Sequence, residues 1–161
     1  MTRQANAAVE DHSRMVGQQP HAQYAALCFR RATDGHQILL ITSRGTGRWV
    51  LPKGWAIKNL TGSGTAAQEA LEEAGVRGKV RSDPIGSYDY NKWLHDGLTV
   101  PCLVQVYPLE VAQLIDDYPE KHERQRRWFK PDEAGCRVEE RQLKKLLNAF
   151  RPEAPPVAGV K

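Results

Sequence analysis

The acidic segment around residue 70 carries the side chains best suited to chemistry. Glu69, Glu72 and Glu73 lie in a run from 64 to 74 that is rich in helix-forming Ala, Leu, Gln and Glu. Since a helix turns by about 100° per residue, the three carboxylates fall within one arc of roughly 100°. Like charges at this spacing destabilise a helix, and a hard cation such as Mg²⁺ would remove the repulsion. The spacing alone also fits an ordinary solvated helix face, so the surrounding residues have to decide.

The residues around this helix follow a recognisable spacing. The chain has the pattern Gly54-x5-Leu60-x7-Gln68-Glu69-x2-Glu72-Glu73-x-Gly75-Val76. This pattern resembles the signature of the Nudix hydrolases, Gly-x5-Glu-x7-Arg-Glu-U-x-Glu-Glu-x-Gly-U, in which U is an aliphatic residue. Two positions depart from it, because Leu60 replaces the first glutamate and Gln68 replaces the arginine.

The resemblance extends over most of the span from Tyr24 to Leu147. The segments that carry it are Leu27–Arg30, Thr42–Arg44, Arg48–Pro52, Arg124–Lys130 and Asp132–Ala134. They resemble the branch of the family that hydrolyses diphosphoinositol polyphosphates and diadenosine polyphosphates. The resemblance implies an α/β fold, the Nudix-type α/β/α sandwich with a mixed sheet.

The resemblance also implies the roles of individual residues. Glu69, Glu72 and Glu73 would bind Mg²⁺, with Mn²⁺ as a possible substitute, and Glu72 would be the leading candidate for general base. The carbonyl of Lys53 or Gly54 would complete the coordination, since a glycine lets the backbone approach an ion closely. The residues expected to bind substrate are Arg44, Lys53, Gly54 and Arg124. Nearby, Trp55 either stacks on a nucleobase or packs beneath the loop.

The two departures affect the expected activity in different ways. In the family the first glutamate contributes less than the later cluster, so Leu60 removes a helper and keeps the core of the metal site. The family arginine pairs with a carboxylate and orients it, whereas Gln68 donates a hydrogen bond without the charge. We therefore expect an active pyrophosphohydrolase. The alternatives are removal of pyrophosphate from RNA 5′ ends, or a degenerate domain that binds polyphosphates without turnover.

The substrate preference follows from one further difference. The resembled branch carries a basic stretch just before its first strand, which suits the densely charged inositol ring. At the matching place this chain reads His21-Ala22-Gln23, which is nearly neutral. We therefore expect diadenosine polyphosphates to be better substrates than diphosphoinositol polyphosphates.

The elements that must position these residues follow from periodicity and turn signals. Strands are expected at 24–30, 37–42, 48–51, 80–93, 99–106 and 126–129. Helices are expected at 64–74, capped by Ser63 or Thr61 and ended by Gly75, and at 139–150. In the first helix, the side expected to pack consists of Ala67, Ala70, Leu71 and Ala74.

Composition places these elements in one domain. The chain has 161 residues, 40% hydrophobic and 26% charged, with a net charge of +4. We expect a flexible arm at 1–20, a Nudix domain at 21–150 and a flexible tail at 151–161. No apolar run reaches the length of a membrane span or a secretion signal, and three widely separated cysteines suit a reducing, cytoplasmic setting.

Neither the charge nor the histidines point to another partner. The expected partner is a small polyphosphate, with no membrane, DNA or protein partner evident. The histidines expected on the surface, without metal-ligand spacing, are His21, His36, His95 and His122.

Overall fold

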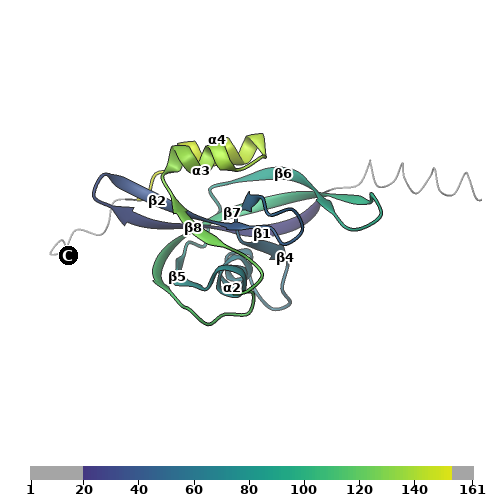
Figure 1. Ribbon diagram of the computed structural model, residues 1–161, viewed down its shortest axis with the longest axis horizontal. Coiled ribbons are helices and arrows are strands. Elements are labelled where there is room, and N and C mark those ends of the chain that lie inside the picture. Colours follow the sequence, from purple (N-terminus) through teal and green to yellow (C-terminus); the bar gives the residue numbers. More distant parts are fainter. Residues whose placement is uncertain (1–19, 154–161) are drawn as a thin grey trace, which may run out of the picture.

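The computed structural model of the chain describes residues 20–153, which form a sheet with helices on both faces (Figure 1). The elements in chain order are β1 (His21–Ala32), β2 (Gly35–Thr42), β3 (Trp49–Val50), β4 (Lys53–Trp55), α2 (Gly62–Ala74), β5 (Val76–Val80), β6 (Gly86–Trp93), β7 (Thr99–Leu114), β8 (Arg126–Phe129), α3 (Pro131–Arg137) and α4 (Arg141–Ala149). The arm expected at 1–20 and the tail expected at 151–161 lie outside the described residues, except for Pro20 and 151–153.

The sheet is mixed and is built around β1 and β7. Its strand order is β3-β2-β1-β7-β5, with β4 paired to β1, β6 to β7 and β8 to β2. β1 and β7 run parallel, with Gln23 opposite Val104, and every other pairing is antiparallel. The central position of β1 explains its apolar run, since all five residues from Ala25 to Phe29 are buried.

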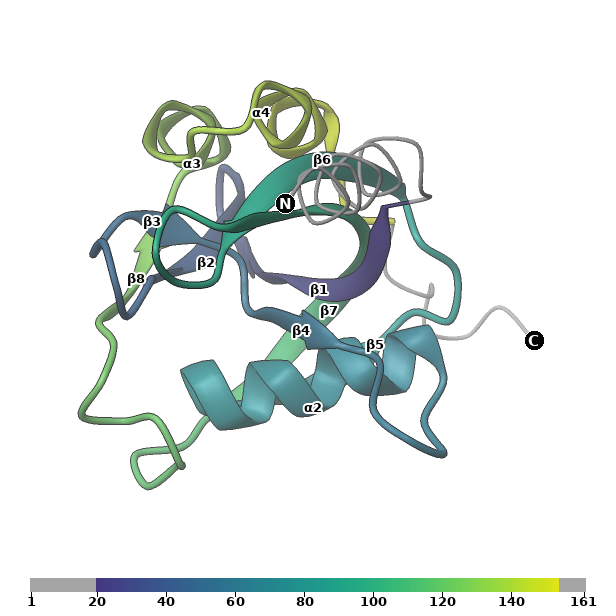
Figure 2. The same ribbon diagram turned by 90° about the vertical axis from the view of Figure 1, so that its right-hand side faces the viewer.

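Each face of the sheet has its own core. Figure 2 shows α2 on one side and α3 with α4 on the other. Ala26 and Cys28 of β1 pack in the core beneath α2, whereas Leu27 and Phe29 pack in the core beneath α3 and α4. This alternation is the period of two expected of a strand that is covered on both faces. The α/β class and the mixed sheet expected from the sequence are confirmed.

The ends of α2 are defined by local chemistry. Thr61 is the N-cap, and its hydroxyl accepts a hydrogen bond from the Gly64 amide at 3.0 Å. At the other end, Gly75 has a φ of 64°, the left-handed conformation that ends many helices. Of the two caps considered, Thr61 is therefore correct and Ser63 is wrong.

Several expected boundaries were wrong. Of the strand expected at 80–93, the part from 86 to 93 is β6, whereas Val80 ends β5 and the connection between the two contains Pro84, which cannot donate a ladder hydrogen bond. The strand expected at 99–106 continues to Leu114, because its far half pairs with β5 and β1. The short helix α3 was not expected, although Pro131 and two acidic residues begin it.

Candidate active site

The signature segment of residues 54–76 (the box) begins in β4, and there it meets the acidic helix α2. The Lys53 amide donates a hydrogen bond to Glu73 Oε1 at 3.1 Å, so β4 lies directly against α2. A Cβ at Gly54 would overlap the Glu69 carboxyl group. A side chain at position 54 would force the Glu69 carboxyl group to move away, so the glycine of the spacing lets that group lie directly against the backbone. The fold therefore brings Glu69, Glu73 and the backbone of 53–54 together.

The Glu73 carboxylate is buried and has two partners. Arg124 Nη2 lies 3.2 Å from Glu73 Oε2, and the other carboxylate oxygen accepts from Lys53. Burial raises the pKa of Glu73, while the Arg124 charge and the Lys53 amide act in the opposite direction. Glu73 is thus held on both oxygens, which fixes the orientation of the carboxylate.

The charges that act on Glu69 are those of other carboxylates, whereas Glu73 has a cationic partner. Burial, and then the charges of Glu73 and Glu72, raise the pKa of Glu69 to about 7. The protonated form of this carboxyl group is therefore favoured relative to an isolated glutamate, because a further negative charge here is unfavourable. A cation bound between these groups would favour the ionised form.

Glu72, like Glu69, is less buried than Glu73. It is partly exposed on α2, and its carbonyl accepts a hydrogen bond from the Glu120 amide at 3.0 Å. This bond ties the segment after β7 to the helix. The carboxylate of Glu72 contributes to the field at Glu69, as the helical spacing predicted.

The sequence analysis missed one acidic residue of the site, Glu120. Its carboxylate accepts from Arg124 Nε at 2.9 Å and lies 3.6 Å from Arg44 Nε. Glu120 also contributes to the raised pKa of Glu69 and of Glu73. The signal in the sequence was weak, since it consisted only of an acidic and a basic residue four positions apart.

The described residues also bear on whether these groups suit a divalent cation. Within 20–153, no three Asp, Glu, His or Cys side chains lie close enough together to hold a metal ion. However, the Glu69 carboxylate lies against Gly54 and is surrounded by other carboxylates. Its oxygen atoms therefore carry a negative charge that is not fully compensated. Oxygen donors of this kind suit hard cations such as Mg²⁺.

The basic residues expected to bind substrate occupy three different environments. Lys53 extends to the other side of the sheet, where its Nζ lies 4.8 Å from the centre of the Tyr90 ring, and burial lowers its pKa to about 8. Arg44 is 58% exposed and lies near Glu123 and Glu120. Arg124 is only 9% exposed, and its guanidinium contacts protein groups.

Trp55 at the end of β4 and Leu60 in the following loop are on the surface. Trp55 is 40% exposed, so it does not pack beneath the loop, and its ring lies 6.0 Å from the His21 ring. Leu60, which replaces the expected glutamate, is 45% exposed. Neither side chain belongs to the core.

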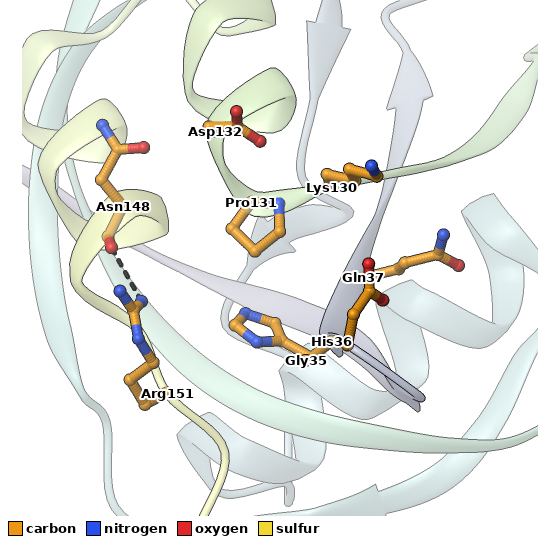
Figure 3. A pocket seen from close by; sticks show the side chains of 9 residues that line it. Gly35, His36, Gln37, Lys130, Pro131, Asp132, Asn148 and Arg151 are labelled. Atoms are coloured by element: carbon orange, nitrogen blue, oxygen red, sulfur yellow. Dashed lines mark hydrogen bonds between the residues drawn. The ribbon is translucent and has the colours of Figure 1, made fainter.

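His36 was expected on the surface and is buried. It lies in β2, is 7% exposed, and packs edge-on against Phe150 with ring centres 5.3 Å apart. Figure 3 shows it in a pocket of about 400 Å³ together with Lys130, Asn148 and Arg151. This pocket involves α3 and α4, so it is separate from the carboxylates of α2.

Comparison with known proteins shows which family shares this arrangement. The family description "NUDIX domain" matches residues 21–150. Nudix hydrolase 12, mitochondrial, of Arabidopsis thaliana is 32% identical over 124 residues, 73% of this chain and 61% of that protein. Diphosphoinositol polyphosphate phosphohydrolase 3-alpha of Homo sapiens is 32% identical over 112 residues, 68% of this chain and 64% of that protein. The chain therefore matches less than two thirds of each relative's length.

Solved structures show the same arrangement of elements. A C. elegans Ap4A hydrolase aligns with a TM-score of 0.59 at 17% identity, over 81% of this chain and 95% of that chain. The E. coli dihydroneopterin triphosphate pyrophosphohydrolase aligns with a TM-score of 0.63 at 14% identity, over 84% of this chain and 100% of that chain. At these identities the likeness shows the fold alone.

Proposed function

The chain belongs to the Nudix family, and on this premise we propose that it is an Mg²⁺-dependent pyrophosphohydrolase acting on dinucleoside polyphosphates. The observation that best supports the proposal is that the Glu73 carboxylate accepts a hydrogen bond from the Lys53 amide and the Glu69 carboxylate lies against Gly54. A solvated acidic helix face does not require such a contact, and burying these groups without a cation is unfavourable.

The metal ligands that we propose are Glu69, Glu72 and Glu73, with the carbonyl of Lys53 or Gly54. A bound Mg²⁺, or Mn²⁺ in its place, would polarise the phosphate oxygens and lower the pKa of a bound water. Of the three carboxylates, Glu73 is held by Lys53 and Arg124. From its place in the signature we assign Glu72, which is partly exposed, as the general base that accepts the proton of the attacking water.

Cationic and aromatic side chains around the box would hold the substrate. Arg44 is exposed and presents a planar fork that suits phosphate oxygens. Lys53 is less well placed than Arg44, because its ammonium is buried against Tyr90 on the other side of the sheet. Trp55 offers an exposed ring on which a base can stack, a contact worth about 1–3 kcal/mol where it occurs.

Linear substrates suit this set of contacts better than a phosphorylated inositol ring. The nearly neutral His21-Ala22-Gln23 lies inside β1, rather than before the first strand as expected, and Gln23 is 1% exposed. An inositol pyrophosphate carries many phosphates and needs many cations, whereas a dinucleoside polyphosphate needs fewer and can use a stacking ring. Among the relatives described above, the diphosphoinositol polyphosphate phosphohydrolase points by its name to the inositol class, so the preference for linear substrates rests on the nearly neutral stretch and the exposed ring.

A substrate panel tests the proposal. Purified protein would be incubated with a diadenosine polyphosphate, a diphosphoinositol polyphosphate and an RNA bearing a 5′ triphosphate, with and without Mg²⁺. We expect Mg²⁺-dependent hydrolysis, with the highest kcat/KM for the diadenosine polyphosphate. Glu73→Gln purified in parallel controls for contaminating activity.

The other outcomes assign a different function. A higher kcat/KM for the inositol compound would move the assignment to that class, and preferred release of pyrophosphate from RNA would favour the RNA activity. Binding of a polyphosphate without turnover under any condition would indicate a domain that binds and does not catalyse.

A further inference from the structure

The acidic helix α2 lacks the positive charge that the family signature places at position 68. Gln68, at the arginine position of the box, is neutral and partly buried. The Glu73 side chain is only 11% exposed, so its ionised form needs a cation or hydrogen-bond donors within the protein. The Lys53 amide provides a donor to one oxygen. The cation must come from outside the helix.

Arg124 supplies that cation from the segment that precedes β8. Its Nη2 contacts Glu73 Oε2 at 3.2 Å, its Nε contacts Glu120 Oε1 at 2.9 Å and its Nη1 donates to the Thr42 carbonyl at 3.1 Å. These three contacts join the helix, the segment after β7 and the end of β2. Glu120 and the Thr42 carbonyl thus fix the guanidinium, and the guanidinium in turn holds the Glu73 carboxylate.

We propose that Arg124 is a positioning residue that orients the Glu73 carboxylate and replaces, from another part of the chain, the charge missing at Gln68. This inference rests on the proposed function, because its catalytic consequence requires Glu73 to be a metal ligand. The contact itself is independent of that role. The geometry explains how the chain tolerates glutamine in its box.

A direct role in binding substrate makes different demands on Arg124. A residue that contacts phosphate must expose its guanidinium, and Arg124 is 9% exposed, whereas Arg44 is 58% exposed. Loss of a substrate contact made equally in the ground and transition states raises KM and leaves kcat unchanged. Loss of a positioning contact lowers kcat and changes KM little.

The kinetic test compares Arg124→Gln and Arg124→Lys with Arg127→Gln. Arg127 is an exposed arginine three positions along the chain, so its variant controls for the loss of one positive charge. We expect kcat to fall by about 100-fold in Arg124→Gln and about 10-fold in Arg124→Lys, with KM within about threefold in both. Lysine retains the charge but lacks the fork that reaches three acceptors. Arg127→Gln should match the wild type.

A stability cycle tests the contact without metal or substrate. The free energy of unfolding would be measured in EDTA for the wild type, Arg124→Gln, Glu73→Gln and the double variant. We expect the double variant to lose less stability than the sum of the single losses, since each single variant removes one partner of the same buried ion pair and the second substitution then has no such contact left to break. If Arg124→Gln does not fold, Arg124→Lys replaces it in both experiments.

The outcomes separate this inference from the proposed function. Additive losses of stability, an unchanged kcat, or a raised KM with unchanged kcat would each overturn the positioning role. If the wild type hydrolyses no substrate but the stability losses are non-additive, the contact stands and the proposed function fails.

Discussion

At the scale of single residues, the buried carboxylate of Glu73 and the partly buried carboxylate of Glu69 differ in how they are compensated. Glu73 has a cation and a backbone donor, whereas the nearest charges at Glu69 are negative. This asymmetry is typical of sites in which neighbouring groups perform different tasks. The substitution of each carboxylate should therefore have its own signature.

We expect Glu73→Gln to lower kcat by at least about two orders of magnitude, because it removes a charged metal ligand. Glu72→Gln should lower kcat similarly, with a smaller effect on Mg²⁺ affinity if it is the base. Steady-state kinetics across a range of Mg²⁺ concentrations measures both. Activity close to wild type for Glu73→Gln at saturating Mg²⁺ would exclude Glu73 as a ligand.

Leu60 provides a second test at this scale. Because its side chain is 45% exposed, Leu60→Glu should not bury a charge and should leave the thermal midpoint unchanged. Activity should remain within about tenfold of the wild type, with a small shift in the Mg²⁺ requirement. A clearly lowered midpoint in a thermal melt would instead show that Leu60 contributes to the core.

At the scale of elements, α2 is held at both ends so that its carboxylates face β4. Thr61 caps the first turn, and Arg126 Nη1 donates to the carbonyls of Ala74 and Ile115 at 2.8 and 2.9 Å. A cation at the C-terminus of a helix is also favoured by the helix dipole. Arg126 Nη2 also lies 3.7 Å from Asp116 Oδ1.

The cap can be tested by a matched pair of substitutions. Thr61→Ala should destabilise the protein by about 1 kcal/mol, because the Gly64 amide loses its acceptor. Ser63→Ala, two positions along, should cost less, since Ser63 is not the cap. Chemical denaturation of both variants measures the difference. An equal or larger loss for Ser63→Ala would contradict the assignment of Thr61.

At the scale of the whole molecule, the face of the sheet away from α2 is closed by the C-terminal helices. Phe150, just after α4, packs on Phe29 of β1 and on His36 of β2. The Nε2 atom of His36 is buried without a hydrogen-bond partner within residues 20–153. Burial, and then the charge of Arg151, lower the pKa of His36. The other charged residues that line its pocket are Asp34, Lys130 and Asp132.

This environment predicts a pH dependence of stability. The unfolded chain binds the His36 proton with a pKa of about 6.5, and the folded chain binds it only at lower pH. Since the unfolded state then holds more protons at this site, the contribution of His36 to stability should fall as the pH drops below about 6.5 and level off below its folded-state pKa, opposite in sign to the contribution of Glu69, whose pKa is raised. His36→Leu should lessen this fall, whereas His122→Gln, at an exposed histidine, should not. Thermal melts between pH 5 and 7.5 measure it, and equal slopes for wild type and His36→Leu would contradict the prediction.

The location of the protein also concerns the whole chain. Among residues 20–153, no helix is both long and apolar enough to cross a membrane. Cys28 and Cys102 are buried and Cys136 is exposed, all as free thiols. The cytoplasmic setting inferred from the cysteines stays a prediction, and the Arabidopsis relative described above carries "mitochondrial" in its name.

Features that depend on local spacing were predictable from the sequence by itself. The period of α2, the glycine that ends it and the box spacing around Gly54 and Glu73 all involve neighbouring residues or one loop. The α/β class followed because several apolar strands and two helices permit few arrangements, and the resemblance narrowed these to one sandwich. The sequence therefore determined which carboxylates share a helix face.

Only the tertiary structure decided which distant groups complete the site. Arg124 lies 51 positions from Glu73, and its partner could not be identified from periodicity. For the same reason Glu120 was missed, and His36 was placed on the surface although Phe150 covers it. Burial and ion pairing depend on segments that approach one another after folding, and these interactions set the charge and the orientation of the carboxylates.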